Sequence, residues 1–266
     1  MLVSLAASAA AVYAGLVAVL YLGQRRLLFR PDKSRPVLGA LAALGVREIA
    51  LLTADGIALS SWYLPPRANR PVILYCHGNG GHIGYRRTRL ARFAEAGYGV
   101  LLLEYRGYGG NPGSPCEQGL CADAAAALDF LVREGIVPGR VALYGMSLGS
   151  GVAVQLAAGR EVGALILEAP YTSIAEAAQA HYPFVPCLWL VRDRFASLAV
   201  IDRIKAPKLI LHGERDRTIP IRLGRALYER AREPKEGWFV PEGGHGDLAA
   251  FGALDTVVAF LKRHLG

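Results

Sequence analysis

The feature that most constrains this chain is the pentapeptide 145–149, which reads Gly-Met-Ser-Leu-Gly. It follows the apolar run 141–144 and opens the helical stretch 151–158. Glycines two residues before and two residues after a serine allow a strained turn from strand to helix, and this turn holds the hydroxyl clear of the sheet. The pattern therefore predicts a strand, a sharp turn and a helix, with Ser147 as a nucleophile.

A serine hydroxyl is a poor nucleophile until a positioned base takes its proton, and the base needs an acidic partner to fix its tautomer. In this architecture the partners follow the serine as Asp or Glu and then His, each in a loop after a later strand. The run 208–211 leads to Asp216, and the run 238–240 leads to His245. Glu168, at the end of another expected strand, is the alternative acid. The order along the chain favours Asp216.

Acyl transfer also needs two backbone N–H donors for the oxyanion that forms. Leu148, directly after the nucleophile, supplies one of them. The second is expected from the glycine-rich loop 77–81, where missing side chains let the backbone approach a substrate. Asn79 is the first candidate and Gly80 the alternative. Gly78 and Gly80 are also candidate substrate contacts.

Seven segments, spread in order over nearly the whole chain, carry a family resemblance: 27–31, 76–80, 104–109, 145–149, 168–173, 212–216 and 243–245. The chain resembles the α/β-hydrolases, and within them the membrane-anchored group with the BEM46-like proteins and the α/β-hydrolase-domain-13 and -17 types. The resemblance implies a serine hydrolase. It leaves the substrate open, because the superfamily includes esterases, lipases, thioesterases, peptidases and non-catalytic members. Gly80, Gly81 and His82 stand where the depalmitoylating types have an acidic or small polar run, which disfavours that activity.

Apolar runs alternate with helical stretches along the chain. Strands are expected at 47–53, 58–64, 72–76, 99–103, 141–144, 164–167, 208–212 and 237–240. Helices are expected at 87–96, 121–134, 148–158, 222–231 and 248–265. The alternation predicts a mostly parallel eight-stranded sheet with helices on both faces, the α/β-hydrolase fold. The catalytic loops should then gather at the carboxyl ends of the strands.

The N-terminal segment has a different character. Residues 1–22 contain no charged side chain, and as a helix they would reach about 33 Å, enough to cross a hydrocarbon core of ~30 Å. We expect a transmembrane anchor helix at 1–24, a basic connector at 25–45 and the catalytic domain at 46–266. A cleaved signal peptide is the alternative, favoured by the alanine run 9–11 and opposed by the missing basic residues before the apolar stretch. A core helix is the third interpretation.

Basic side chains follow the apolar stretch closely: Arg25, Arg26, Arg30, Lys33 and Arg35. The positive-inside rule then predicts that the catalytic domain lies on the cytoplasmic side. A formal net charge of +8 fits a domain near anionic lipid headgroups, and an ordinarily basic proteome explains it equally well. Nucleic acid is not an expected partner, since the basic residues are dispersed and no nucleic-acid-binding motif occurs.

About 40 residues separate the sixth and seventh expected strands, which leaves room for a small cap at about 171–205. Its stretch 182–191 is apolar, aromatic and rich in proline. One interpretation is that the cap lines an acyl pocket and touches the bilayer, with Tyr171, Phe184 and Trp189 as substrate contacts. The other is that it merely packs over the sheet, because pockets and cores share this composition.

No cofactor or metal is expected, since no histidine and cysteine cluster has zinc spacing and no phosphate or dinucleotide fingerprint occurs. The four cysteines, at 76, 116, 121 and 187, are expected to be free thiols, although Cys116 and Cys121 would pair in an oxidising compartment. His77 and His212 are expected to shape loops through backbone hydrogen bonds. Asp247 is expected to cap the last helix.

Together these features predict a membrane-anchored serine hydrolase of carboxylic esters, most simply lipid-like acyl esters, with small soluble esters left open. An acyl-protein or acyl thioesterase is the alternative with the same chemistry. A non-catalytic, membrane-tethered interaction protein is the alternative of another class. A peptidase is disfavoured because the sequence supplies neither a propeller nor a large lid.

Overall fold

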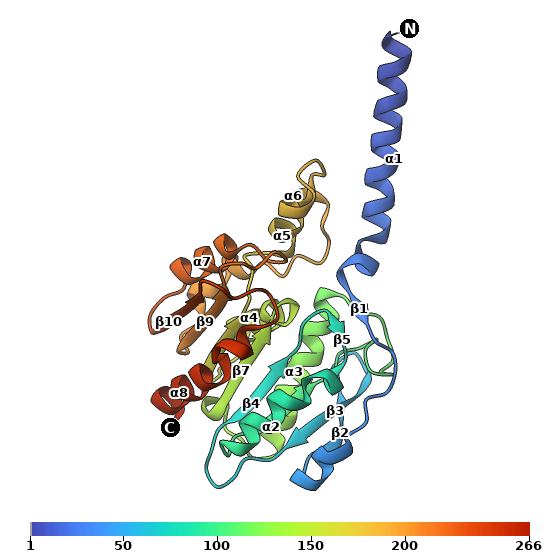
Figure 1. Cartoon of the computed structure of the whole chain (residues 1–266). Coiled ribbons are helices and arrows are strands. Elements are labelled where there is room, and N and C mark those ends of the chain that lie inside the picture. Colours follow the sequence, from blue (N-terminus) through green and yellow to red (C-terminus); the bar gives the residue numbers. More distant parts are fainter. Residues whose placement is uncertain (1) are drawn as a thin grey trace.

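The computed structural model describes residues 2–266 and is built on one eight-stranded sheet of order β10-β9-β8-β7-β4-β6-β3-β2 (Figure 1). The strands are β2 Arg47–Leu52, β3 Ala58–Leu64, β4 Val72–Cys76, β6 Gly99–Leu103, β7 Val141–Met146, β8 Ala164–Glu168, β9 Lys208–Gly213 and β10 Lys235–Val240. β3 pairs antiparallel with both β2 and β6, and the other neighbours are parallel. The predicted α/β-hydrolase sheet is therefore confirmed.

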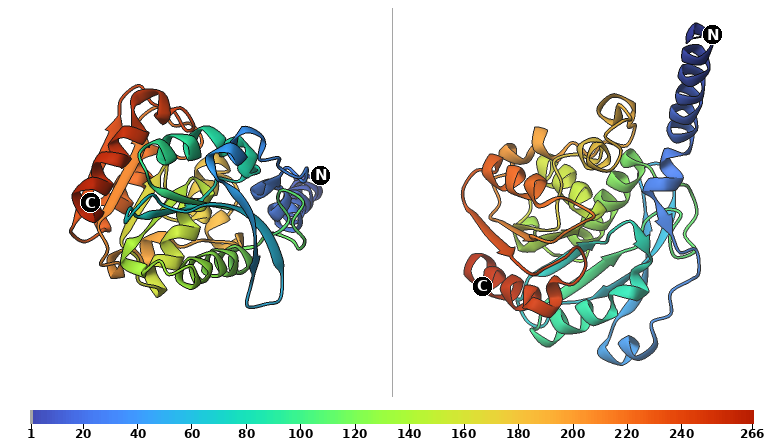
Figure 2. Two further views of the ribbon diagram at one scale, coloured as in Figure 1. Left: turned by 90° about the horizontal axis from the view of Figure 1, so that it is seen from below. Right: turned by 45° about the horizontal axis from the view of Figure 1, so that its top comes forward.

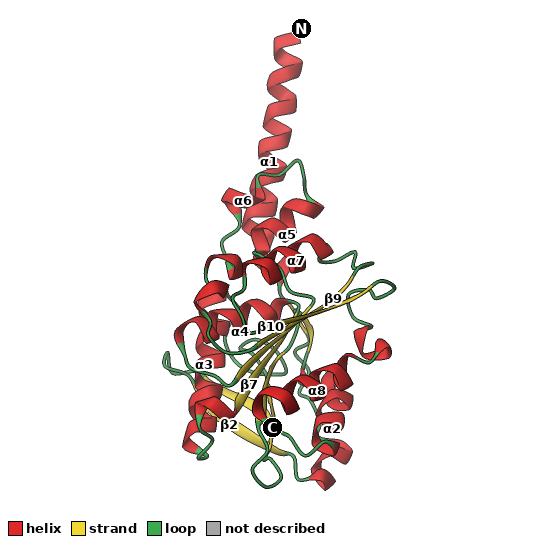
Figure 3. Ribbon diagram, turned by 90° about the vertical axis from the view of Figure 1, so that its left-hand side faces the viewer, coloured by secondary structure: helices red, strands yellow, loops and turns green. Residues whose placement is uncertain are grey.

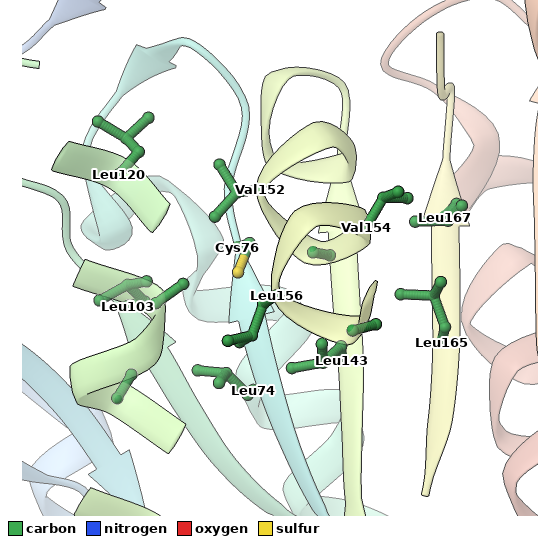
Figure 4. Packing of buried hydrophobic residues seen from close by; sticks show 14 of the residues in the cluster. Leu74, Cys76, Leu103, Leu120, Leu143, Val152, Val154, Leu156, Leu165 and Leu167 are labelled. Carbon is green, nitrogen blue, oxygen red and sulfur yellow. The ribbon is translucent and has the colours of Figure 1, made fainter. Parts of the chain in front are cut away.

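Helices cover both faces of this sheet (Figure 3). They are α2 Arg87–Glu95, α3 Glu117–Arg133, α4 Leu148–Gly159, α7 Ile221–Arg230 and α8 Ala253–Leu265. Successive side chains of β4 point to opposite faces, because the side-chain period of a strand is two. Leu74 and Cys76 pack in the cluster with α3, α4 and α7, while Ile73 and Tyr75 pack in the cluster with α2 and α8. Figure 4 shows the first cluster, with Leu156 of α4 beside Leu74 and Leu143, and Val152 near Cys76.

Short elements connect these layers. The 3-10 helices are η1 Gly39–Leu44, η2 Ile83–Arg86, η3 Pro138–Arg140, η4 Ser197–Ala199, η5 Ile201–Arg203 and η6 Leu248–Phe251. The small cap between β8 and β9 contains α5 Ile174–His181 and α6 Cys187–Leu190. The single helix expected at 248–265 is divided, because Gly252 between η6 and α8 adopts a φ of 93°. Cap and N-terminal helix rise from the same side of the molecule (Figure 2).

The N-terminal helix α1 spans Leu2–Leu28 and projects from the body (Figure 1). It ends four residues beyond the expected anchor boundary at residue 24, so 25–28 form its last turn. It contains no buried residue, and an 18-residue window has a mean hydropathy of 2.1. Within the described residues it is the one helix long and apolar enough to cross a membrane. The connector then forms β1 Arg30–Pro31, which pairs parallel with β5 Gly80–Gly81.

Helix α4 approaches the sheet closely enough to require glycine. A Cβ atom on Gly149 would lie 2.0 Å from the Cys76 carbonyl oxygen, and one on Gly145 would lie 2.4 Å from the Gly149 carbonyl oxygen. Backbone atoms cannot give way as a flexible side chain does. The two glycines of the pentapeptide therefore serve helix-to-sheet packing as well as the turn.

We expect Gly149→Ala to destabilise the protein by about 2 kcal/mol or more, because the added methyl group displaces α4 from the sheet. The melting temperature in detergent should fall by about 5 °C. Gly159→Ala is the matched control at the end of the same helix, where an added Cβ meets nothing within 4 Å. Its melting temperature should be unchanged or raised, since alanine is the better helix former. Equal melting temperatures for the two variants would contradict the packing argument.

Candidate active site

Ser147 lies at the sharp turn between β7 and α4. Its backbone has φ 51° and ψ −120°, a conformation that costs an ordinary residue about 1–3 kcal/mol and persists only where the surroundings enforce it. Here the Ser147 N–H donates to the Glu168 carbonyl at 2.8 Å, and the Ser147 carbonyl accepts from the Ser150 N–H at 2.8 Å. Gly78 packs directly beside it, with an ideal Cβ position 3.5 Å from the Ser147 Cβ.

The structure brings the three predicted residues Ser147, Asp216 and His245 into one hydrogen-bonded chain. His245 Nε2 lies 3.0 Å from Ser147 Oγ, and His245 Nδ1 lies 2.7 Å from Asp216 Oδ2. A carboxylate only accepts, so Nδ1 carries the proton and donates it to Asp216. Nε2 is thereby left as the acceptor for the Ser147 hydroxyl. Each residue lies just after the carboxyl end of its strand, β7, β9 or β10.

The Asp216 carboxylate is held by more than His245. Its Oδ1 accepts the backbone N–H groups of Thr218 and Ile219 at 2.7 and 2.8 Å. His212 Nε2, which donates to the Ile219 carbonyl, lies 3.2 Å from Asp216 Oδ2. Burial acts to raise the pKa of Asp216, but the hydrogen bonds from His212, His245 and the Ile219 N–H outweigh it, so the pKa lies well below its ordinary value. Asp216 therefore stays ionised beside His245.

The alternative acid, Glu168, is committed elsewhere. Its two carboxylate oxygens accept a bidentate pair from Arg89 at 2.6 and 2.7 Å, and the Tyr144 hydroxyl also donates to it. Glu168 is fully buried beneath the turn. Arg89 was not singled out from the sequence, although its spacing of four residues from Phe93 places it on the apolar face of α2.

Asn79 and Leu148 flank Ser147 at the floor of a cavity. The Asn79 amide donates to the Leu28 carbonyl at 2.9 Å, and the Asn79 carbonyl accepts from the Arg30 N–H at 3.1 Å and the Tyr108 hydroxyl at 3.0 Å. Among residues 2–266, the backbone N–H groups of Asn79 and Leu148 have no hydrogen-bond acceptor. Both are thus free to donate to a bound group.

Two glycines predicted as substrate contacts lie outside the cavity lining. Gly80 belongs to β5, opposite Arg30 of β1, and its place outside the lining favours Asn79 as the oxyanion donor. Gly78 lies beside Ser147, without lining the cavity. His77 shapes this loop as predicted, since its Nδ1 lies 2.7 Å from the Gly78 carbonyl oxygen. Its Nε2 lies 3.1 Å from Glu104, which also accepts the Ile83 N–H.

The cavity above Ser147 and His245 has a volume of about 520 Å³. Tyr171 lines it as predicted, whereas Phe184 and Trp189 do not. Phe184 and Trp189 are 63% and 86% exposed, whereas Val185 and Leu190 of the same stretch line the cavity. The wall that the sequence did not reveal is α1, which contributes Val17, Leu20, Tyr21, Gln24, Leu27 and Leu28.

The other residues singled out from the sequence make local contacts. The Asp247 carboxylate accepts the Gly244 N–H at 2.7 Å, and no side-chain cap bond starts the helix after it, so the predicted capping role is wrong. Asp247 instead holds the backbone of the loop that carries His245. His212 bonds the Ile219 carbonyl, as expected of a loop-shaping residue. All four cysteines are free, and the described residues contain no cluster of three or more side chains suited to a metal ion.

Comparison with known proteins agrees with this fold. The family model described as serine aminopeptidase, S33 (Hydrolase_4) matches residues 67–201. An uncharacterized protein of Mycobacterium tuberculosis is 40% identical over 96% of this chain and 92% of its own. The lysophosphatidylserine lipase ABHD12 of Danio rerio is 37% identical over 66% of this chain and 51% of its own. The Pyrococcus furiosus esterase Pf2001 superposes with a TM-score of 0.74 at 20% identity, covering 89% of this chain and 100% of that one. The chain belongs to the α/β-hydrolase superfamily.

The lowered pKa of Asp216 makes a prediction about acid stability. A carboxylate with a depressed folded-state pKa contributes stability above its unfolded value near 4, and this contribution is lost as the pH falls through the folded value. Asp216→Asn is neutral in both states. We therefore expect wild type to melt at a higher temperature than Asp216→Asn at pH 7 and pH 5, with the difference narrowing below about pH 4. A difference that stays constant down to pH 3 would contradict an ionised Asp216.

Proposed function

We propose that this chain is a membrane-anchored serine hydrolase that cleaves carboxylic esters with lipid-like acyl chains. The ester-cleaving class is supported by the family match, the lipase relative and the esterase fold. The observation that carries the proposal is the chain of hydrogen bonds from Asp216 through His245 to Ser147. It ends at the floor of a cavity whose walls are mostly apolar.

In the proposed reaction Ser147 Oγ attacks the ester carbonyl carbon while His245 Nε2 takes the hydroxyl proton. The carbonyl oxygen becomes an oxyanion that accepts the N–H groups of Asn79 and Leu148. His245 then returns the proton to the leaving alkoxide, which departs as the alcohol and leaves an acyl group on Ser147. Water, deprotonated by His245, attacks this acyl group and releases the acid and the free serine. Asp216 stays ionised and stabilises the protonated imidazole.

The cavity favours an acyl group over a peptide N-terminus. A peptidase that reads a free amino terminus needs an available carboxylate near the nucleophile. Asp193 is the only acidic residue among the described residues that line the cavity. Its two carboxylate oxygens accept hydrogen bonds from Arg25 at 2.8 and 3.2 Å. An acyl thioester fits the same machinery, because the leaving group alone differs. A purely non-catalytic role does not account for an assembled nucleophile, base and acid.

The proposed domain division follows the same contacts. Helix α1 is the membrane anchor, residues 46–266 form the catalytic domain, and the cap occupies about 171–205. Basic side chains gather at the base of α1, where Arg192 of the cap lies 4.3 Å from the ring centroid of Tyr21 and Arg25 pairs with Asp193. Such charges suit a cytoplasmic membrane surface. We therefore propose that the catalytic domain faces the cytoplasm.

The catalytic proposal predicts that Ser147→Ala abolishes ester hydrolysis and labelling by a fluorophosphonate probe, because no other hydroxyl meets His245 Nε2. The variant should keep the wild-type melting temperature. Ser114→Ala, at an exposed serine, is the matched control and should keep full turnover and labelling. Asp216→Asn should lower kcat by roughly 10⁴-fold. Undiminished turnover in Ser147→Ala would refute the proposal.

The orientation proposal predicts that a tag added after Gly266 is protected when protease is applied to sealed cells. Digestion should follow only after the membrane is permeabilised, because the tag and the catalytic domain share one side. A periplasmic or extracellular protein of known orientation, expressed in the same cells, controls for the reach of the protease. Digestion of the tag in intact cells would overturn the cytoplasmic placement.

A further inference from the structure

Helix α1 presents one continuous stripe to the cavity. Its lining residues begin at Val17, follow at spacings of three and four residues, and end at Leu28, which is the spacing of one helix face. The opposite face carries Val19 and Leu22, which are 68% and 76% exposed. From Val17 to Leu28 the stripe extends about 16 Å along the helix. Its outer part, from Val17 to Tyr21, lies in the uncharged stretch of α1, and its inner part, from Gln24 to Leu28, lies beside Arg25 and Arg26.

The facing wall comes from the cap and is also apolar. Its lining residues include Ile174, Ala177 and Ala178 of α5, followed by Val185 and Leu190. The two alanines leave space between α5 and α1, and neither wall places a free charge along this slot, because Asp193 is paired with Arg25. The slot is therefore shaped for a hydrocarbon chain, with Ser147 and His245 at its inner end.

Polar contacts at the two ends of the slot fasten its walls together. Near the outer end the Tyr13 hydroxyl donates to the Phe184 carbonyl at 2.8 Å. Near the inner end the Gln24 amide donates to the Leu190 carbonyl at 3.3 Å and accepts from the Arg192 N–H at 2.8 Å. These contacts hold α1 and the cap together at both ends of the slot. The apolar residues between the contacts therefore line a gap of fixed width.

The outer end of the slot lies at the apolar tip of the cap. Phe184, Leu188 and Trp189 there are 63%, 42% and 86% exposed, and Phe184 is tied to Tyr13 in the apolar part of α1. A cluster of exposed aromatic and aliphatic side chains beside a membrane-crossing helix is suited to the bilayer rather than to water. The slot thus runs from the level of the lipid chains to the nucleophile.

We infer that α1 is part of the substrate-binding site as well as the anchor: the acyl chain of a membrane lipid ester lies between α1 and the cap, entering sideways from the leaflet. This inference rests on the proposed function of Ser147. The carbonyl carbon sits at Ser147, the chain follows the stripe from Leu28 toward Val17, and its end points to the cap tip. The chain therefore need not leave the bilayer to be cleaved.

The first test compares Leu20→Trp, which fills the middle of the slot, with Leu22→Trp, which adds the same side chain to the lipid-facing side of α1. In vesicles, hydrolysis of palmitoyl esters relative to butyryl esters should fall about tenfold or more for Leu20→Trp, since the indole ring occupies the space of the long acyl chain. Leu22→Trp should keep the wild-type ratio. An unchanged ratio for Leu20→Trp, or an equal fall for Leu22→Trp, would overturn the inference.

Leu20→Ala provides a second variant that adds no bulk. Losing the leucine contact with the chain should also lower the palmitoyl-to-butyryl ratio, by roughly 10-fold for a loss of about 1.5 kcal/mol of buried side-chain contact. Melting temperatures of all three variants in detergent verify that they are folded. A wild-type ratio in a folded Leu20→Ala would count against α1 as a binding wall.

The second test maps the chain directly. A long-chain alkyl fluorophosphonate with a diazirine at the chain end phosphonylates Ser147, with loss of fluoride, and then crosslinks on irradiation. We expect crosslinks to residues 13–21 of α1 and 182–191 of the cap. Labelling of Ser147 with crosslinks elsewhere would overturn the inference and leave the proposed function standing. Failure to label Ser147 with long-chain and short-chain probes alike would reject both.

Discussion

The close approach of α4 to the ends of β4 and β7 is the constraint on which the site depends. With no side chain at Gly149, the helix backbone comes within reach of the Cys76 and His77 carbonyl groups, where a Cβ would lie 2.0 and 2.6 Å away. The chain can then leave β7 only through the strained turn at Ser147. This turn aims the hydroxyl at His245, and it leaves the Leu148 N–H, in the first turn of α4, without a helical partner.

Asn79, the proposed second oxyanion donor, is held by the segment that follows α1. The Asn79 side chain and carbonyl are bonded to Leu28 and Arg30, and β1 pairs with β5 immediately beyond. On the other side, Glu104 holds His77 and the Ile83 N–H. Asn79 is thus fixed between the core of the sheet and the end of α1. The loop 77–81 and helix α1 are consequently held in a fixed position relative to each other. This position sets how far Ser147 lies from the outer end of the slot.

The sequence predicted the features that follow from local pattern. β3, β4 and β6 begin and end at the expected residues, and the order of Ser147, Asp216 and His245 predicted which side chains the structure brings together. Features that depend on which face of an apolar segment packs against the rest of the protein could not be predicted from the sequence. An all-apolar stretch has no polar side to orient it, so the sequence did not reveal that α1 walls the cavity. The exposure of Phe184 and Trp189 was not predictable either, because the composition of the stretch 182–191 does not say which of its apolar side chains face outward.

Asp193 joins the two walls of the cavity, α1 and the cap, to the start of α3. Its carboxylate accepts from Arg25 of α1 and from the Glu117 N–H at the start of α3, while its backbone belongs to the cap. The Asp193 side chain is 5% exposed, whereas that of Arg25 is 51% exposed. The cost of burying the Asp193 carboxylate offsets much of its attraction to Arg25, so the pair adds little net stability. Its role is to fix the positions of the segments that it joins. It keeps α1 and the cap at a fixed separation just above Ser147. Helix α1 is therefore packed as a structural member of the domain that contains Ser147 and is not joined to it by a flexible linker.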